Sequence, residues 1–196
     1  MAERLNRRPD LPRPVGDALA TIADRLSVRP VTWSVGGSVA RWLRGFEVTP
    51  EDIDLDTGSD YSYGVFHALQ DFLVSPPATP DRVHFPCTIA RYDISGVPVE
   101  VIVDLHIRTR CEYRGLFSSY QGRVVGLPFR SRAIPVTPLE ESILVNIVMD
   151  RWDRLAEFTA SRAFRLSFDL SYFTRRAAEI ALPDALVRRF LRLAKV

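Results

Sequence analysis

The sequence predicts an α+β fold, in which a mixed β-sheet with helices is followed by a C-terminal helical lobe. Residues 31–45 have the pattern of a strand, a glycine turn and a helix, and residues 83–107 have that of a strand hairpin. From residue 137 onward the apolar residues recur at helical spacing. A sheet-forming part followed by a purely helical part is typical of α+β proteins.

We divide the chain into an N-terminal arm over residues 1–14, a core over 15–134 and a helical lobe over 135–196. With 196 residues, 46% of them hydrophobic, the core and the lobe can form one compact domain. The arm is charged and proline-rich, and no run of about eighteen apolar residues exists, so we expect neither a signal peptide nor a membrane span. A cytoplasmic location is the resulting expectation.

The charged residues limit how the protein can bind anions. The net charge is only +2, which provides little general attraction to nucleic acid. Lys195 is the sole lysine among 26 basic residues. Any cationic side chain that clamps a phosphate must therefore be arginine, whose planar guanidinium suits phosphate oxygens.

The first elements of the core are a helix, a strand and a second helix. Apolar residues recur at helical spacing over 15–26. Residues 31–35 are rich in β-formers and lead into Gly36-Gly37, after which Ser38 is expected to cap a short helix that stops at Gly45.

Most of the remaining core is predicted to be strand, apart from a helix at 63–73 that ends before the breakers Ser75-Pro76-Pro77. Residues 52–56 alternate carboxylate and aliphatic side chains, which predicts a strand with one polar face. Residues 83–94 and 97–107 form the predicted antiparallel hairpin. Residues 108–134 are expected to be an irregular segment, rich in arginine and aromatic residues, that contributes to substrate binding.

The lobe is predicted to contain three helices. The tetrapeptide at 137–140 has the form of a capping box with proline at the first helical position, which predicts a long helix to about residue 158. Helices over 164–180 and 184–193 complete the chain.

Asp52 and Asp54 are the first candidates for catalysis. The period of two in a strand places both carboxylates on one face, while Ile53 and Leu55 point into the core. Two such carboxylates, together with substrate phosphate oxygens, suit the octahedral coordination of Mg²⁺. An Asp-x-Asp pair can equally be a solvated strand edge, so the pair alone does not define a site.

The glycine turn is the second candidate, as a phosphate-binding element formed by Gly36, Gly37 and Ser38. Backbone N–H groups at the start of a helix attract anions, and the missing side chains let a phosphate approach closely. Arg41 follows three residues after Ser38 on the same helix face and can reach the same anion. A plain tight turn and a surface ion pair are the simpler explanations of these residues.

A third carboxylate is needed for phosphoryl chemistry with two metal ions. Glu100 and Asp104 both lie in the predicted strand 97–107, flanked by apolar residues, and the period of two places them on the same face. Burying an acid in such a run is costly without a partner, which favours a functional role. The sequence leaves both candidates open.

These motifs resemble those of the nucleotidyltransferase superfamily typified by DNA polymerase beta, in particular its minimal bacterial nucleotidyltransferases and antitoxin-paired toxins. The family pattern is a hydrophobic residue with Gly-[Gly/Ser], then acid-hydrophobic-acid-hydrophobic, and later hydrophobic-acid-hydrophobic. In this chain the pattern reads Val35-Gly36-Gly37-Ser38, Asp52-Ile53-Asp54-Leu55 and Val99-Glu100-Val101. The match covers residues 31–105, about half of the chain.

The resemblance implies a nucleotidyltransferase core and an Mg²⁺-dependent reaction, in which an acceptor hydroxyl attacks the α-phosphate of a nucleoside triphosphate (NTP) and pyrophosphate leaves. It implies that Asp52, Asp54 and Glu100 bind two metal ions, with Asp104 as the alternative third acid, and that Gly37 and Ser38 bind phosphates. The acceptor would be an RNA end such as that of tRNA, or a protein. An aminoglycoside fits the arginines of 108–132 less well, and the toxin branch would add an antitoxin partner.

The chain departs from the family pattern in the lobe. Asn146 stands where many relatives have a helix lysine, and Arg165 stands at a second lysine position, whereas Asp169 is retained. An arginine such as Arg151 or Arg154 would have to replace the lysine. The alternatives are a non-catalytic nucleotide-binding or regulatory module and an interaction protein on the same scaffold.

Overall fold

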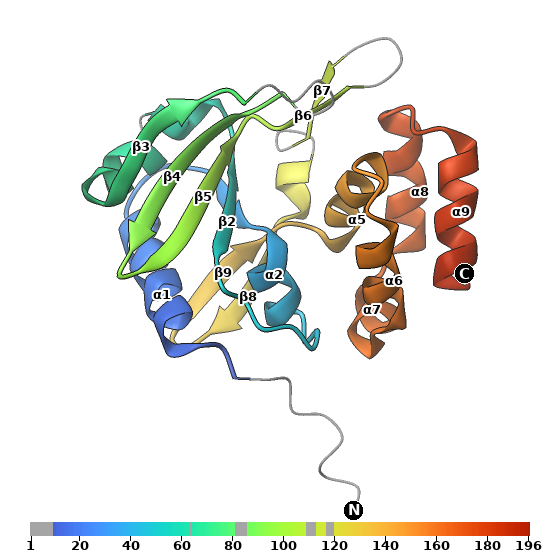
Figure 1. Cartoon of the computed structure of the whole chain (residues 1–196), viewed down its shortest axis with the longest axis horizontal. Helices are drawn as coiled ribbons and strands as arrows, with labels where there is room; N and C mark the ends of the chain where they lie inside the picture. The colour runs from blue at the N-terminus through green and yellow to red at the C-terminus, as the bar shows by residue number, and fades with distance from the viewer. Residues whose placement is uncertain (1–9, 63, 81–85, 109–112, 117–119) are drawn as a thin grey trace, which may run out of the picture.

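A seven-stranded mixed sheet forms the centre of the molecule (Figure 1). The computed structural model describes residues 10–62, 64–80, 86–108, 113–116 and 120–196. The strand order is β3-β4-β5-β2-β1-β9-β8, with β2–β5 and β1–β9 parallel and the other pairs antiparallel. The strands are β1 (Trp33–Val35), β2 (Ile53–Thr57), β3 (Leu73–Ala78), β4 (Thr88–Ile94), β5 (Val97–Val103), β8 (Val125–Phe129) and β9 (Arg132–Val136). Strands β6 (His106–Arg108) and β7 (Tyr113–Gly115) form a separate pair.

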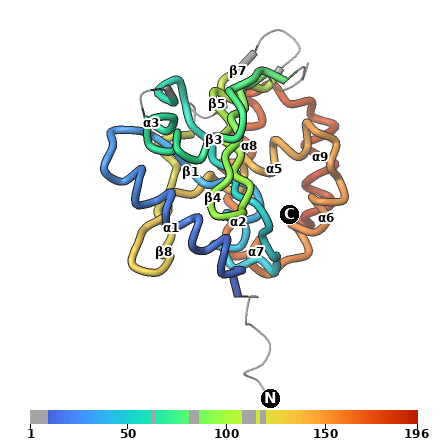
Figure 2. The backbone as a smooth tube through the Cα atoms, turned by 60° about the vertical axis from the view of Figure 1, so that its left-hand side comes forward, coloured from blue at the N-terminus to red at the C-terminus, as the bar shows by residue number. Residues whose placement is uncertain are grey.

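The helices of the second half gather on one side of the sheet, and Figure 2 shows the same grouping from another direction. They are α5 (Leu139–Val148), α6 (Trp152–Ala160), α7 (Arg162–Ser167), α8 (Leu170–Glu179) and α9 (Asp184–Ala194). The helices of the first half are α1 (Arg13–Ser27), α2 (Gly37–Leu43) and α3 (Val65–Leu69). The predicted α+β class is confirmed. In the described residues no helix is long and apolar enough to cross a membrane.

Two clusters of buried apolar side chains stabilise the fold. One joins α1, α2 and α3 to the sheet and includes the fully buried Leu19 and Leu55. The other joins the C-terminal helices and centres on Phe164, Phe173 and Phe190, with the Phe190 ring in contact with both of the others. The partly buried Val48 packs against both clusters, where the sheet and the helical lobe meet.

The sheet has proline-containing strands at both edges. The run Ser75-Pro76-Pro77, expected to be a breaker, belongs to edge strand β3, and Pro128 lies in edge strand β8. Proline lacks the N–H that a second neighbour would need, but an edge strand has only one neighbour. The helix expected at 63–73 is shorter in the structure: α3 ends at Leu69, and β3 begins at Leu73.

The expectation of an irregular segment over 108–134 is wrong for β7, β8 and β9. Strands β8 and β9 form a hairpin whose turn includes Arg130 with a positive φ of 51°, and β9 then pairs in parallel with β1. No glycine or Asn-Gly signal marks this turn, so the sequence pattern does not reveal it. Residues 109–112 and 117–119 lie outside the described part.

The predicted long helix and the predicted helix 164–180 are each divided in two. Asp150 has a positive φ of 55°, which ends α5 before α6 begins. Phe168 and Asp169 separate α7 from α8, and the Asp169 carboxylate accepts a hydrogen bond from the Tyr172 N–H. The expected capping box is also wrong, because Pro138 is the N-cap of α5 and makes no side-chain cap.

Candidate functional site

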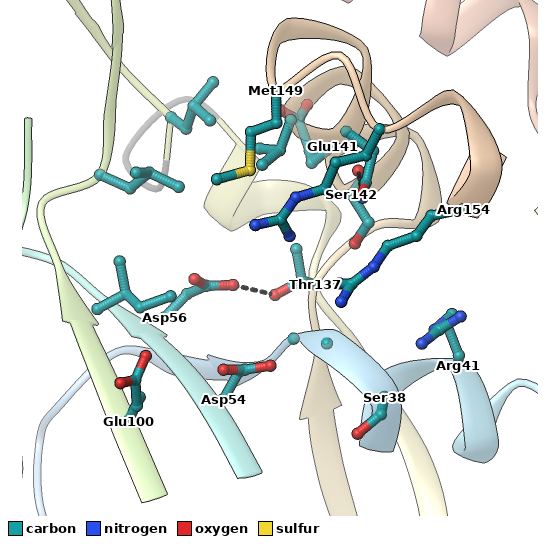
Figure 3. A pocket seen from close by; sticks show the side chains of 18 of the residues that line it. Ser38, Arg41, Asp54, Asp56, Glu100, Thr137, Glu141, Ser142, Met149 and Arg154 are labelled. Atoms are coloured by element: carbon teal, nitrogen blue, oxygen red, sulfur yellow. Dashed lines mark hydrogen bonds between the residues drawn. The ribbon is translucent and has the colours of Figure 1, made fainter. Parts of the chain in front are cut away.

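A pocket of about 370 Å³ lies between the sheet and the helical lobe. Figure 3 shows carboxylates from the strands on one wall and arginines from α2 and α6 on the opposite wall. The sequence-predicted residues that line it are Gly36, Gly37, Ser38, Arg41, Asp52, Asp54, Glu100, Asn146, Arg151 and Arg154. The fold therefore brings together residues that are separated by more than a hundred positions in the chain.

Asp52 and Asp54 reach the pocket from the start of β2. Asp52 is exposed and lies just before the strand, whereas Asp54 is half-buried within it. Ile53 and Leu55 point to the opposite face and are fully buried, as the alternation predicts. Both carboxylates thus face the pocket while the strand is held by its apolar side.

Glu100 and Asp104 are separated by the structure. Strand β5 runs parallel to β2, with Glu100 opposite Asp54, and Glu100 lines the pocket. Asp104 follows the end of β5 with a positive φ of 52° and does not line the pocket. The strand ends four residues before the predicted limit, so the period of two no longer applies to Asp104. Glu100 also accepts a hydrogen bond from Arg91 Nε at 3.0 Å.

The acids of this wall repel one another. Burial, followed by the negative charges of Asp52, Asp56 and Glu100, raises the pKa of Asp54 to about 7. The positive charge of Arg154 acts in the opposite direction but does not outweigh burial and the neighbouring acids. In the described residues no three His, Cys, Asp or Glu side chains are close enough to hold a metal ion by themselves. The acids nevertheless fit a cation that is bound jointly with substrate oxygens, because its charge would relieve the repulsion.

Asp56 is a pocket residue that the sequence reasoning missed. It continues the alternation of Asp52 and Asp54, but it is buried, and its carboxylate accepts a hydrogen bond from Thr137 Oγ1 at 2.6 Å (Figure 3). Burial raises the pKa of Asp56, although hydrogen bonds from Thr137 and Tyr120 act in the opposite direction. The strand alternation that pairs Asp52 with Asp54 places Asp56 on the same face, so this pattern could have identified it.

Thr137 joins the two halves of the pocket. Its hydroxyl donates to Asp56 of β2 and lies 2.8 Å from Ser34 Oγ of β1. It stands between β9 and α5, so this buried network links the sheet to the first helix of the lobe. The hydroxyl predicted to cap α5 is used here instead, since a buried carboxylate requires a donor.

The glycine turn packs directly against the acids. Gly37 has a positive φ of 54°, and a Cβ atom at this position would lie 1.8 Å from Asp54 Oδ2. No other residue type satisfies both conditions. The backbone of the turn therefore lies next to the Asp54 carboxylate. A phosphate that contacts the turn would also lie close to Asp54.

Ser38 and Arg41 occupy α2 beside the acids, but Ser38 is not the predicted cap. The N-cap is Gly36, and Ser38 Oγ instead donates a weak hydrogen bond of 3.4 Å to Asp52. Arg41 lies over the Phe158 ring and 3.9 Å from Glu157. Burial and the nearby Arg154 lower the pKa of Arg41, so two guanidinium groups face the pocket together.

The lobe supplies Asn146, Arg151 and Arg154 to the same pocket. Asn146 Nδ2 donates to the Ser142 carbonyl on its own helix, whereas Asn146 Oδ1 is buried and has no hydrogen-bond partner. Arg154 extends from α6 toward the pocket (Figure 3). The two arginines named as replacements for the family lysine are thus placed at the site. Arg165 is exposed on α7 and does not line it.

The arginines of residues 108–132 that can be described form no part of this pocket. Arg130 pairs with Asp17 at 2.7 Å, and Arg132 forms two hydrogen bonds with Asp24, both on α1. Arg123 lies over the Tyr172 ring and 3.8 Å from Asp169. Each of these three arginines has an acid of the same chain as its partner, and none of them lines the pocket. Arg110 lies outside the described residues.

Comparison with known proteins identifies the fold. No family model and no curated protein matches the chain. A solved structure, a putative nucleotidyltransferase (TM1012) from Thermotoga maritima, matches with a TM-score of 0.67 and 21% identity over 74% of this chain and 90% of that one. ANT(2")-Ia in complex with adenylyl-2"-tobramycin covers 92% of this chain and 97% of its own with 14% identity, but its TM-score of 0.46 is too low to support an argument. The chain therefore has the fold of this putative nucleotidyltransferase.

Proposed function

We propose that the protein transfers a nucleoside monophosphate from an NTP to an acceptor hydroxyl in an Mg²⁺-dependent reaction. The observation that carries the proposal is the composition of the pocket. A glycine turn that packs against Asp54, further strand acids, and arginines on the opposite wall share one cavity in a nucleotidyltransferase fold. Anionic phosphates and a divalent cation together match this separation of charge.

Each group has a separate role in the proposed reaction. Asp52, Asp54 and Glu100 would hold Mg²⁺, which supplies charge neutralisation at the phosphates when it is bound. The backbone N–H groups of the Gly36–Ser38 turn bind phosphate oxygens, and Arg41 and Arg154 offset their charge. The acids also attract the proton that leaves the acceptor hydroxyl. Catalysis would consist mainly of positioning and charge stabilisation.

The acceptor is proposed only as a class. An RNA end, a protein side chain or a small molecule can supply the hydroxyl, and a role as the toxin of a toxin–antitoxin pair would add a protein partner. The paired state of Arg123, Arg130 and Arg132 removes one argument for RNA. The pocket itself holds both acids and arginines, so its charge does not exclude cationic acceptors.

Transfer of label from triphosphates tests the proposal. The protein is incubated with each of the four α-³²P-labelled NTPs, Mg²⁺ and one of three acceptor pools: total RNA, bulk protein or aminoglycosides. We expect label in one pool, and we expect Asp54→Asn to abolish it. Glu51→Gln is the matched control, because Glu51 is an exposed acid next to Asp52 that does not line the pocket. Equal labelling by wild type and Asp54→Asn would contradict the assignment.

A second candidate is a nucleotide-binding module without turnover, and Asn146 is the observation that favours it. The family lysine is missing at this position, and the amide that replaces it leaves its oxygen without a partner. Such a module would bind NTP and Mg²⁺ but label none of the pools. If Arg154 performs the lysine's role, Arg154→Gln should weaken NTP binding about tenfold, the scale of one charge-assisted hydrogen bond. Isothermal titration of a non-hydrolysable NTP measures this loss of binding, and the labelling assay shows whether binding is accompanied by turnover.

A further inference from the structure

A second pocket, of about 900 Å³, adjoins the first one. One side is formed by the end of α2 and the residues that follow it. The other side is formed by the facing parts of α6 and α7. Arg41 and Phe158 line both pockets, so they form the boundary between them. A ligand in the second pocket would therefore lie directly beside a nucleotide in the first.

Arg44 lines only the second pocket, and its charge is poorly compensated. The side chain is half-buried, and its Nη1 donates a long hydrogen bond of 3.5 Å to the Ala40 carbonyl. Among the described residues no carboxylate forms an ion pair with Arg44 within 4.0 Å, although Glu140 acts on it from a greater distance. Burial lowers the pKa of Arg44 to about 10. A desolvated guanidinium without a close anion is costly in free energy.

The other walls suit an anionic ligand with an apolar part. Arg41 and the exposed Arg162 add positive charge, while Glu47 and Glu157 are the acids at the pocket. Leu166, which is 75% exposed, adds apolar surface at the edge of the pocket. The pocket therefore has three arginines and two acids around an apolar surface. Arg41 has Glu157 as its partner, whereas in the described part of the chain the desolvated Arg44 has no carboxylate within ion-pair distance.

We propose that this second pocket binds a phosphate group, with Arg44 as its main donor and Arg41 shared with the nucleotide pocket. A phosphate would supply the anion that Arg44 lacks, and the guanidinium can bind two of its oxygens at once. Free phosphate and a phosphodiester of a nucleic-acid acceptor have the same chemistry at this site. Assigning the phosphate to the acceptor rests on the proposed function, whereas phosphate binding does not.

Thermal unfolding of the full chain in increasing inorganic phosphate tests the site. We expect phosphate to raise the Tm of wild type, because a ligand of the folded state stabilises it. Arg44→Met should shift the half-maximal phosphate concentration upward about tenfold or more, the scale of one or two charge-assisted hydrogen bonds. Arg165→Met is the matched control, since Arg165 is an exposed arginine of α7 outside both pockets. Arg44→Gln replaces Arg44→Met if the latter does not fold.

Without phosphate, Arg44→Met should unfold at the same temperature as wild type or higher, since it removes an uncompensated charge. A folded Arg44 variant with the wild-type phosphate response would overturn the proposal. Asp54→Asn should keep the phosphate response even though it abolishes transfer. Phosphate binding in a wild-type protein that labels no acceptor would thus contradict the proposed function and leave this site standing.

The source of the phosphate is distinguished by the diribonucleotide ApA, titrated while a non-hydrolysable ATP analogue with Mg²⁺ fills the first pocket. If Arg44→Met weakens ApA binding as it weakens inorganic phosphate binding, the site takes an acceptor phosphodiester. If Arg44→Met weakens the binding of inorganic phosphate but not that of ApA, the site takes free phosphate. Insensitivity of both probes to Arg44→Met overturns the proposal.

Discussion

Asp54 and Glu100 lie opposite each other in the parallel strands β2 and β5, so two acids far apart in the sequence face one pocket. Their side chains share a face because both strands alternate with the same period and are in register. Negative charge is thereby concentrated at a half-buried position, where the fold alone provides little compensation for Asp54. The stability of the protein should therefore depend on the protonation of Asp54.

In the absence of metal ions, the free energy of unfolding should fall as pH rises from about 4 to about 7. The folded-state pKa of Asp54 is raised to about 7 from an ordinary value of 3.8, so folded protein binds the extra proton in that range. Stability is therefore greatest below the unfolded pKa and is lost as pH passes through the folded pKa. The full effect is on the order of 4 kcal/mol. Chemical denaturation in EDTA at several pH values measures it.

Asp54→Asn is the control for this pH dependence. The variant lacks the titrating group, so its stability at pH 7.5 should exceed that of wild type, and its pH profile over this range should be flatter. Added Mg²⁺ should stabilise wild type more than the variant if the acids bind it. Parallel pH profiles for the two proteins would show that Asp54 does not titrate as described.

Gly37→Ala should displace the Asp54 carboxylate. The new Cβ would lie 1.8 Å from Asp54 Oδ2, and the φ of 54° adds backbone strain. We expect a loss of stability of about 2 kcal/mol and loss of NTP binding. Gly96→Ala isolates the backbone effect, because Gly96 has a φ of 82° and a Cβ added there would meet no atom within 4 Å. Denaturation and NTP titration of both variants separate strain from steric conflict; equal NTP binding by the two would contradict the argument.

Thr137→Val should destabilise the protein by about 1–3 kcal/mol, because the buried Asp56 carboxylate loses a donor without a replacement. Thr137→Ser keeps the hydroxyl and should recover most of this stability. Equilibrium unfolding at pH 7.5 compares the two variants. A valine variant as stable as the serine variant would mean that the hydrogen bond between Thr137 and Asp56 contributes nothing.

Arg176→Met should be strongly destabilising. Arg176 Nε lies 2.6 Å from Glu141 Oε1 in a salt bridge whose partners are both buried, so the change leaves Glu141 with an uncompensated charge. The expected cost is about 3–5 kcal/mol. Arg175→Met is the matched control, because Arg175 forms an exposed pair with Glu179 and should lose at most about 1 kcal/mol. Similar unfolding midpoints for the two variants would contradict the role of burial.

The sequence by itself determined the elements whose signals are local. The alternation around Asp52 and Asp54, the glycine turn and the helical spacing after residue 137 were sufficient to predict the α+β class and to name residues that do line the pocket. They were sufficient because a strand's period and a glycine's freedom depend on the chain within a few residues. The family resemblance added the expectation that Glu100 acts together with Asp52 and Asp54.

Only the tertiary structure decided between Glu100 and Asp104, because that choice depends on where β5 ends and which residue lies opposite Asp54. The tertiary structure likewise decided that Thr137 donates to Asp56, because this hydrogen bond joins segments 81 residues apart. The arginines of residues 108–132 show the reverse case. Their composition suggested substrate binding, but folding places Arg130 and Arg132 against acids of α1. Long-range pairing of charges has no local periodicity, so no sequence pattern records it.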